Sequence, residues 1–237
     1  ATSRGTGELI AAALRAGARR VLVAVGGSAM TDGGLGAVDA LRWNLAGVDL
    51  VVAADVETAF VDAAAVFGPQ KGATAAQVAL LTRRLERLAA IYRERTGFDV
   101  GDLRHAGAAG GLAGGLAALG ARLEPGFEVV AGAAGLEAAL AGVDLVVTGE
   151  GRFDRPSLAG KVAGGVLEWA ESDGVPHRAV IAGQVAADLR TAGAPPGVLV
   201  LALTDRVWQE GEAFTRAALL VEEAAVEAGR WAMGEPP

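Results

Sequence analysis

The densest set of side chains that could do chemistry lies around residue 150. Glu150 and Asp154 follow the apolar run of residues 145–148, and Ser157 and Lys161 come shortly after them. Two carboxylates, a hydroxyl and an ammonium within one turn could bind Mg²⁺, accept a proton and balance phosphate charge. The same residues could instead form a purely structural network of helix caps and ion pairs, and both interpretations stay open.

A glycine-rich turn near the start of the chain is a second candidate. It contains Gly26, Gly27 and Ser28 and leads to Asp32. Glycines let the backbone approach a ligand closely and point its N–H groups at an anion such as a phosphate or a carboxylate. Asp32 could bind Mg²⁺ or accept a proton, or it could simply cap the next helix. The P-loop and the G-x-G-x-x-G dinucleotide motif are both absent.

Lysine is scarce, which draws attention to Lys71. Lys71 and Lys161 are the only lysines in the chain. A compact ammonium held by a Gly-Pro turn at the start of a helix is suited to contact a phosphate, although most lysines are only solvated surface charges. Asp55, directly after the apolar run of residues 50–54, is a further carboxylate at the end of an expected strand.

Residues 105–115 carry almost no side chains beyond Ala and Gly. Either a ligand or a neighbouring element must therefore come close to this backbone. We expect Gly107, Gly110 and Gly111, which open a helix, to bind a ligand, and the later glycines to serve close packing. His105 is expected at the surface or at the helix start rather than in catalysis.

The elements that must position these residues follow from short apolar runs without polar alternation. Such runs predict strands buried on both faces of a parallel sheet, and they span residues 21–25, 50–54, 145–148, 179–182 and 198–203. Helical patterns lie between them, at residues 6–16, 74–95, 111–119, 136–140, 161–172 and 212–230. The longest of these helices opens with a capping box formed by Thr74 and Gln77.

Strands alternating with helices predict an α/β fold with a mainly parallel sheet or sheets flanked by helices. In such folds ligands gather beyond the carboxyl ends of the strands, so we expect the candidate residues to share one edge. The expected organisation is a first α/β region over 1–52, a middle segment with the long helix over 53–140 and a C-terminal α/β segment over 141–237, with two interleaved domains as one arrangement.

Composition excludes several classes of function. The formal net charge is −7, with 28 acidic against 21 basic residues, which argues against a nucleic-acid binder and against a polybasic membrane-surface protein. The chain has no Cys, so a disulfide scaffold, a thiolate nucleophile and an iron–sulfur site are excluded. No apolar segment is long enough for a membrane span or reads as a signal peptide. We therefore expect a soluble cytoplasmic protein with a small-molecule substrate.

In order and spacing, these motifs resemble those of the bacterial type I glycerate kinases (glycerate 2-kinases). The most specific blocks are Phe-Gly-Pro-Gln-Lys-Gly-Ala at 67–73 and Thr-Gly-Glu-Gly at 148–151, and further blocks lie at 6–10, 26–34, 55–56, 107–111 and 154–161. The resemblance implies phosphorylation of D-glycerate by ATP with Mg²⁺, usually to 2-phosphoglycerate. It also implies two α/β domains with the active site between them.

Phosphoryl transfer needs mostly positioning and charge neutralisation, which suggests a role for each candidate. Lys71 would offset phosphate charge, Glu150 and Asp154 would hold Mg²⁺ or position substrate, and either Asp32 or Asp154 would deprotonate the attacking hydroxyl. The remaining candidates would contact substrate or phosphate; they are Gly26, Gly27, Ser28, Asp55, Gly107, Gly110, Gly111, Ser157 and Lys161.

The sequence also departs from the family pattern. The family's N-terminal strand with its Asp-Ser-Phe-Lys motif has no counterpart here, Met30-Thr31 stands where Thr-Asn is usual, and Glu57-Thr58-Ala59 stands where Asn-Pro is common. The main alternative is therefore a catalytically inactive, ligand-binding fragment of a glycerate kinase-like protein. An NAD-dependent dehydrogenase fits the α/β pattern but lacks the glycine fingerprint. The 2- or 3-phosphoglycerate product stays open, as does the oligomeric state, for which a homodimer is one option.

Overall fold

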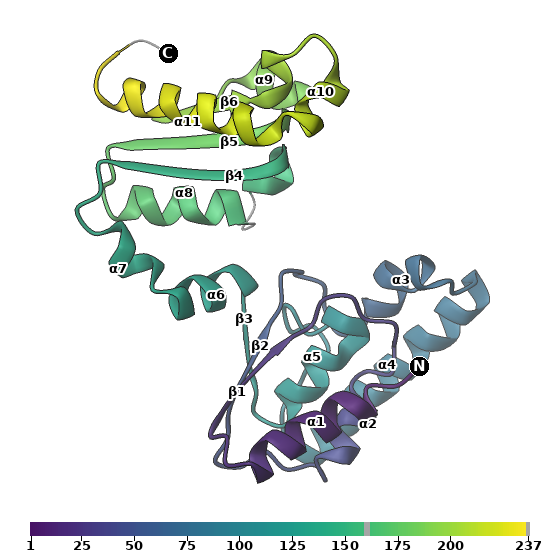
Figure 1. Ribbon diagram of the computed structural model, residues 1–237. Helices are drawn as coiled ribbons and strands as arrows, with labels where there is room; N and C mark the ends of the chain where they lie inside the picture. The colour runs from purple at the N-terminus through teal and green to yellow at the C-terminus, as the bar shows by residue number, and fades with distance from the viewer. Residues whose placement is uncertain (159–161, 236–237) are drawn as a thin grey trace. The chain divides into compact units, whose positions relative to one another are not determined.

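The computed structural model of the chain describes residues 1–158 and 162–235 and divides into two compact units, Ala1–Val129 and Val130–Pro237 (Figure 1). Each unit contains a three-stranded parallel sheet, with strand orders β1-β2-β3 and β4-β5-β6. The predicted α/β class with parallel sheets flanked by helices is confirmed. The expected segments 1–52 and 53–140 differ from this division, because strands from both of them form the first sheet.

The sheet of the first unit consists of β1 (Arg20–Ala24), β2 (Asp49–Ala53) and β3 (Arg122–Glu124). β1 and β2 lie within one residue of the predicted runs, and they pair in parallel with Val23 opposite Val52. β3 pairs with the last residues of β2. It was not predicted, because a three-residue strand of mixed polarity leaves no apolar run to detect.

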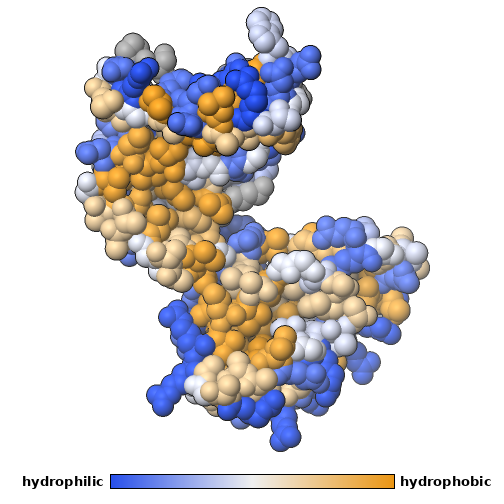
Figure 2. Space-filling view, in the orientation of Figure 1, coloured by the Kyte–Doolittle hydropathy of each residue, from blue (hydrophilic) through white to orange (hydrophobic). Residues whose placement is uncertain are grey.

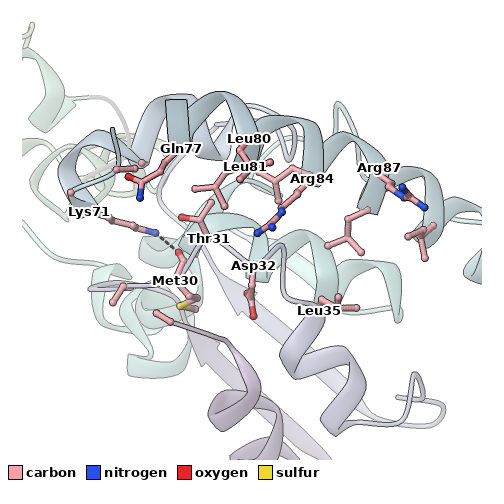
Figure 3. A pocket seen from close by; sticks show the side chains of 18 residues that line it. Met30, Thr31, Asp32, Leu35, Lys71, Gln77, Leu80, Leu81, Arg84 and Arg87 are labelled. Atoms are coloured by element: carbon pink, nitrogen blue, oxygen red, sulfur yellow. Dashed lines mark hydrogen bonds between the residues drawn. The ribbon is translucent and has the colours of Figure 1, made fainter. Parts of the chain in front are cut away.

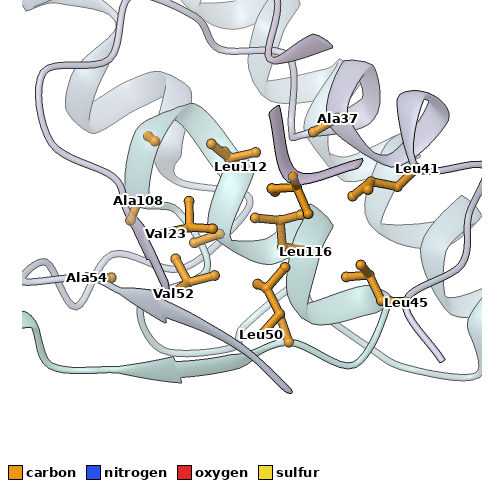
Figure 4. Close-up of a cluster of buried hydrophobic side chains, with 14 residues drawn as sticks. Val23, Ala37, Leu41, Leu45, Leu50, Val52, Ala54, Ala108, Leu112 and Leu116 are labelled. Atoms are coloured by element: carbon orange, nitrogen blue, oxygen red, sulfur yellow. The ribbon is translucent and has the colours of Figure 1, made fainter. Parts of the chain in front are cut away.

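Two hydrophobic clusters meet at α5 (Ala108–Ala118), a helix whose residues are all buried. One cluster joins α5 to β1, β2, α1 (Arg4–Arg15) and α2 (Leu35–Ala40), and Leu112, Leu116, Val23 and Val52 are among its members (Figure 4). The other joins the far side of α5 to α3 (Ala63–Phe67) and α4 (Ala75–Thr96). A helix buried on all sides needs small residues, which explains its Gly and Ala content.

The long helix α4 forms as predicted. Thr74 accepts a hydrogen bond from the backbone of Gln77, the reciprocal bond completes the capping box, and Gly97 ends the helix in a left-handed conformation. Its buried Tyr92 donates a 2.8 Å hydrogen bond to the carbonyl oxygen of Gly33, and burial raises the pKa of this phenol. α4 is thereby fastened to the loop that precedes α2.

The second sheet consists of β4 (Leu145–Phe153), β5 (His177–Val185) and β6 (Val198–Ala202). Ala179 and Ile181 of the central strand pack against α10 (Glu210–Thr215) and α11 (Ala217–Ala232). Val180 and Ala182 face α8 (Val162–Ser172) and α9 (Ala187–Ala192) instead. Figure 1 shows α8 and α11 on opposite sides of the sheet, and helices pack on both faces of the central strand β5, as predicted.

Three predicted boundaries in the second unit are wrong. β4 does not end at residue 148 and β5 does not end at residue 182, because glycines continue both strands. A Cβ at Gly149 would lie only 2.5 Å from the carbonyl oxygen of Ile181, so this close approach requires glycine. The helix expected over 212–230 is broken at Arg216 into α10 and α11. The short helices α6 (Gly126–Ala134) and α7 (Leu136–Leu140) precede β4.

Part of the surface of each unit is apolar. On the face shown in Figure 2, hydrophobic side chains gather over β1–β2 and over β4–β5, where Leu22 and Val147 are 50% and 44% exposed. Across residues 1–158 and 162–235, no helix combines the length and the hydrophobicity that a membrane crossing requires.

Candidate active site

A cavity of about 300 Å³ lies at the carboxyl ends of β1 and β2, and we call it the strand-end cavity. Ligands bind at this edge in parallel α/β sheets. The residues that line it come from four separate stretches of the chain; they are Val25, Gly26, Gly27, Ser28, Ala53, Asp55, Val56, Phe67, Gln70, Lys71, Ala108 and Ala109. The structure therefore brings together five of the residues selected from the sequence, namely Gly26, Gly27, Ser28, Asp55 and Lys71.

Lys71 is held over this cavity by the short 3₁₀ helix η1 (Pro69–Lys71), which starts with a proline and ends at Gly72 in a left-handed conformation. Its ammonium donates hydrogen bonds to the carbonyl oxygen of Met30 (2.6 Å) and to the hydroxyl of Ser28 (3.1 Å). An ammonium has three N–H donors, so one is left for a ligand. Burial lowers the pKa of Lys71, and the negative charge of Asp32 opposes this shift.

The turn at Gly26 and Gly27 is open to a ligand. A Cβ added to either glycine would meet no other atom within 4 Å, and Gly27 has a φ of 66°. Packing inside the protein therefore does not explain why these positions are glycine. A backbone conformation that favours glycine, next to an open cavity, is what a close approach to an anion requires.

The glycines at 107, 110 and 111 differ from Gly26 and Gly27 in their packing, and their role in binding a ligand stays a prediction. A Cβ at Gly107 would clash with the carbonyl of Ala59, one at Gly110 with that of Met30, and one at Gly111 with the backbone of Gly33. Neighbouring protein segments fill the space beside them. Their packing places the intervening Ala108 and Ala109 on the strand-end cavity.

Ala109 has an unusual backbone conformation at this cavity. Its φ is 53°, a left-handed value that costs free energy for a residue other than glycine. The next residue, Gly110, accepts a 3.0 Å hydrogen bond from the backbone N–H of Gly33. His105 is half-buried, and its Nδ1 lies 2.8 Å from the carbonyl oxygen of Val56. These two contacts connect the segment of residues 105–110, which contains Ala108 and Ala109 of the cavity wall, to the segments around Gly33 and Val56.

Asp32 fastens helix starts rather than facing the strand-end cavity. Its Oδ2 accepts hydrogen bonds from the hydroxyl of Thr2 (3.1 Å) and from the backbone N–H (2.7 Å) and hydroxyl (2.8 Å) of Ser3. Its Oδ1 accepts one from the backbone N–H of Gly34 (3.2 Å). These four bonds tie the start of α1 to the start of α2. They favour the capping interpretation of Asp32 over the catalytic one.

Asp55 is the carboxylate that the strand-end cavity offers. It is exposed, it lines the cavity, and its Oδ1 accepts a 2.9 Å hydrogen bond from the backbone N–H of Gly126. Its Oδ2 forms no hydrogen bond with the residues that the structure describes. One oxygen thus orients the side chain, and the other is free to accept a proton or a hydrogen bond from a ligand.

In the second unit, the turn expected at Glu150 is absent, because β4 continues to Phe153. Glu150 pairs with Ala182 across the sheet and lines a cavity of about 830 Å³ together with apolar side chains such as Leu203 and Phe214. The carboxylate oxygen Oε1 of Glu150 is buried, and it has no hydrogen-bond partner among the residues that the structure describes. A buried acceptor without a donor is costly, so this side chain is poised to receive one.

Asp154 and Ser157 bond to each other at the start of the 3₁₀ helix η2 (Arg155–Leu158). Asp154 Oδ1 accepts from the backbone N–H (3.1 Å) and the hydroxyl (3.0 Å) of Ser157. Ser157 is completely buried, so it supports Asp154 instead of facing a cavity. Lys161 and the preceding Gly160 lie outside the described residues.

In residues 1–158 and 162–235, no group of three or more His, Cys, Asp or Glu side chains could hold a metal ion. Mg²⁺ in phosphoryl-transfer sites is commonly held by one or two carboxylates, with substrate phosphates and water supplying the other oxygens. The assignment of Glu150 and Asp154 to Mg²⁺ stays a prediction.

Sequence analysis missed a second cavity in the first unit. It has a volume of about 770 Å³, shares Lys71 with the strand-end cavity and is walled by α4, including Gln77, Arg84 and Arg87 (Figure 3). The spacing of these three residues places them on one helical face, and that was the available signal. Because arginines usually lie on the solvent-exposed face of a helix, their spacing did not predict a cavity.

The first unit is a parallel α/β unit in which an open glycine turn, a lysine and a free carboxylate meet at the carboxyl ends of the strands. The family model described as the glycerate kinase family matches residues 1–47 and 41–233. The chain belongs to the glycerate kinase family.

Curated relatives agree with this assignment. Glycerate 2-kinase of Escherichia coli is 39% identical over 204 residues, which cover 72% of this chain and 54% of that protein. An uncharacterized protein of Mycobacterium tuberculosis is 46% identical over 205 residues, which cover 81% of this chain and 54% of that protein. The chain thus spans about half the length of the curated relatives it matches.

A solved structure agrees as well. A crystal structure assigned to glycerate kinase 2 of Salmonella typhimurium LT2 matches with a TM-score of 0.71 and 33% sequence identity, covering 97% of this chain and 70% of that one. The recognition made from the sequence motifs is confirmed at the level of the family.

Proposed function

We propose that this protein transfers a phosphoryl group from ATP to D-glycerate and yields 2-phosphoglycerate. The observation that carries the proposal is the strand-end cavity, where the Lys71 ammonium, the open turn at Gly26 and Gly27 and the free oxygen of Asp55 line one space. Support comes from the family and from the relatives named glycerate kinase and glycerate 2-kinase. A cytoplasmic location, where ATP is at hand, belongs to the same proposal.

The residues of the strand-end cavity fit the needs of phosphoryl transfer, which are positioning and charge neutralisation. Lys71 would offset negative charge on the acid or the phosphate, and the backbone at Gly26 and Gly27 would bind the anion. Asp55 becomes our first choice for accepting the proton of the attacking hydroxyl, because one of its oxygens is free. Asp32 and Asp154, the choices made from the sequence, already accept hydrogen bonds from neighbouring residues.

Glu150 and Asp154 remain the proposed carboxylates for Mg²⁺ or for positioning substrate. Bound together with ATP, Mg²⁺ would neutralise phosphate charge. In that arrangement this chain would contribute the buried Oε1 of Glu150, which has no hydrogen-bond partner among the described residues.

A coupled assay with ATP, Mg²⁺ and D-glycerate tests the proposal, with chromatography to separate 2-phosphoglycerate from 3-phosphoglycerate. Formation of 2-phosphoglycerate supports it, and formation of the other isomer corrects the product. The alternative is a catalytically inactive protein that keeps a ligand site, which is favoured by the engagement of Asp32 in four structural hydrogen bonds. No turnover combined with thermal stabilisation by D-glycerate or ATP would support that alternative.

A further inference from the structure

The cavity of about 770 Å³ in the first unit follows α4, and we call it the α4 groove (Figure 3). One wall is a single face of this helix, on which lining residues recur at intervals of three and four positions; they are Gln77, Leu80, Leu81, Arg84, Leu85, Arg87, Leu88 and Ile91. The other lining residues are Ala1, the loop of Ala29–Asp32, Leu35 and the segment of Gly68, Lys71, Gly72 and Ala73. Figure 3 shows Lys71 toward one end of this face and Arg87 toward the other.

The lining of the α4 groove carries excess positive charge. Lys71, Arg84 and Arg87 are its cationic side chains, and Asp32 is its carboxylate. The two oxygens of Asp32 already accept four hydrogen bonds from Thr2, Ser3 and Gly34. Within the described part of the chain, neither Arg84 nor Arg87 forms an ion pair. The groove therefore offers two unpaired guanidinium groups to an anion.

The groove also presents apolar side chains, which a purely inorganic anion would not need. Leu35, Leu80 and Leu81 line it, and Leu80 is 42% exposed. A single exposed leucine is common, but leucines beside a row of cations form a surface that is both apolar and positively charged. The matching ligand has an anionic chain and an apolar face, as a nucleoside polyphosphate does.

We propose that the α4 groove binds the nucleoside triphosphate, with its polyphosphate chain against Lys71, Arg84 and Arg87 and its nucleoside against the leucines. The inference rests on the proposed function in one respect, namely that a phosphate donor is used at all. Lys71 lines both the groove and the strand-end cavity. A terminal phosphate at Lys71 would therefore lie beside the cavity assigned to the small acid, which is the arrangement that transfer between the two ligands requires.

Calorimetric titration of the full chain, without glycerate, tests the inference with ATP and with inorganic tripolyphosphate as probes. The double variant Arg84→Gln/Arg87→Gln should bind both probes about tenfold more weakly than the wild type. The matched control is Arg83→Gln, an exposed arginine on the same helix that does not line the groove, and its affinities should stay within about twofold of the wild type. Leu80→Ser should weaken ATP binding and leave tripolyphosphate binding unchanged.

Equal losses in the double variant and in Arg83→Gln would mean general charge attraction and would overturn the inference. Unchanged affinity in the double variant would overturn it too. If Leu80→Ser left ATP binding intact, the nucleoside would not lie on the leucines, and the groove would be a site for inorganic polyphosphate only.

The same variants separate this inference from the proposed function. Glycerate phosphorylation with an unchanged KM for ATP in the double variant would refute ATP binding in the α4 groove and support the proposed kinase activity. ATP binding that depends on Arg84 and Arg87, in a protein that never phosphorylates glycerate, would support the groove as a nucleotide site and refute the proposed kinase activity.

Discussion

The ammonium of Lys71 donates a 2.6 Å hydrogen bond to the carbonyl oxygen of Met30, a residue 41 positions earlier in the chain. This contact joins the Gly-Pro turn before α4 to the loop that follows β1. It places one cation on the walls of both the strand-end cavity and the α4 groove. Lys71 is therefore the residue on which the two proposed ligand sites depend together.

Lys71→Met removes this cation while keeping most of the side-chain volume. We expect glycerate phosphorylation to fall by about 100-fold or more, since a positioned donor to a reacting anion contributes that much. Far-ultraviolet circular dichroism should be unchanged. Arg15→Gln, which removes an exposed cation from α1, should retain full turnover. A folded Lys71→Met protein with wild-type turnover would remove Lys71 from the mechanism.

The pH dependence of stability provides an independent test of Lys71. Burial lowers its pKa, so between that lowered value and the ordinary lysine value of about 10.4 the unfolded chain binds more protons at this residue than the folded chain does. Stability therefore rises with pH in this window. In urea titrations between about pH 7 and pH 10, the wild type should gain stability relative to Lys71→Met. If the wild type instead lost stability relative to Lys71→Met as the pH rises, the ammonium would not be desolvated in solution.

Two glycines with the same backbone conformation should respond differently to alanine. Gly27 has a φ of 66° and open space beside it, whereas Gly110 has a φ of 65° and lies against the carbonyl of Met30. Both substitutions cost about 1–2 kcal/mol for the left-handed conformation. Gly110→Ala should cost roughly 2 kcal/mol more in urea unfolding, because the methyl group also overlaps the Met30 backbone.

In ligand binding, the order of the two effects should be the reverse of their order in stability. Gly27→Ala should weaken binding of D-glycerate to the folded protein, since its methyl group enters the strand-end cavity. Equal destabilisation by both variants would show that the loop at Met30 moves aside, and the packing explanation for Gly110 would fail.

Some of the fold could be predicted because its signals are local. The capping box of Thr74 and Gln77 and the final Gly97 define α4 within one residue, and the apolar runs define β1 and β2 equally well. β4 and β5 were placed correctly but cut short. Glycine usually ends a strand, and only the close approach of Gly149 to Ile181 in the neighbouring strand makes it a strand residue here.

The site was harder to predict, because the role of each of its residues depends on residues that are far away in the sequence. A glycine such as Gly27 beside an open cavity and one such as Gly110 packed against Met30 look the same in the sequence. The structural role of Asp32 depends on Thr2 and Ser3, about thirty positions away. Likewise, the groove residues Arg84 and Arg87 could be recognised only once another face of α4 was known to pack inside the protein through Ala89 and Tyr92.

Asp32→Ala should destabilise the first unit by about 2 kcal/mol, because it leaves several donors at the starts of α1 and α2 without their acceptor. Asp62→Ala is the matched control, an exposed aspartate that precedes α3 without a side-chain cap, and it should change stability by less than about 0.5 kcal/mol. Chemical denaturation measures both effects. If Asp32→Asn kept the stability and lost turnover, Asp32 would act in catalysis as well as in the fold.

Asp55→Asn separates binding from proton transfer in the strand-end cavity. The amide oxygen can still accept the hydrogen bond from the Gly126 backbone, so the side chain should keep its position, but it cannot accept a proton. We expect kcat to fall by about 100-fold or more while the KM for D-glycerate changes little. Asp102→Asn, an exposed position outside the strand-end cavity, should leave both values unchanged. If Asp55→Asn kept the wild-type kcat and Asp154→Asn lost it, the proton acceptor would belong to the second unit, and the strand-end cavity would serve to bind the acid alone.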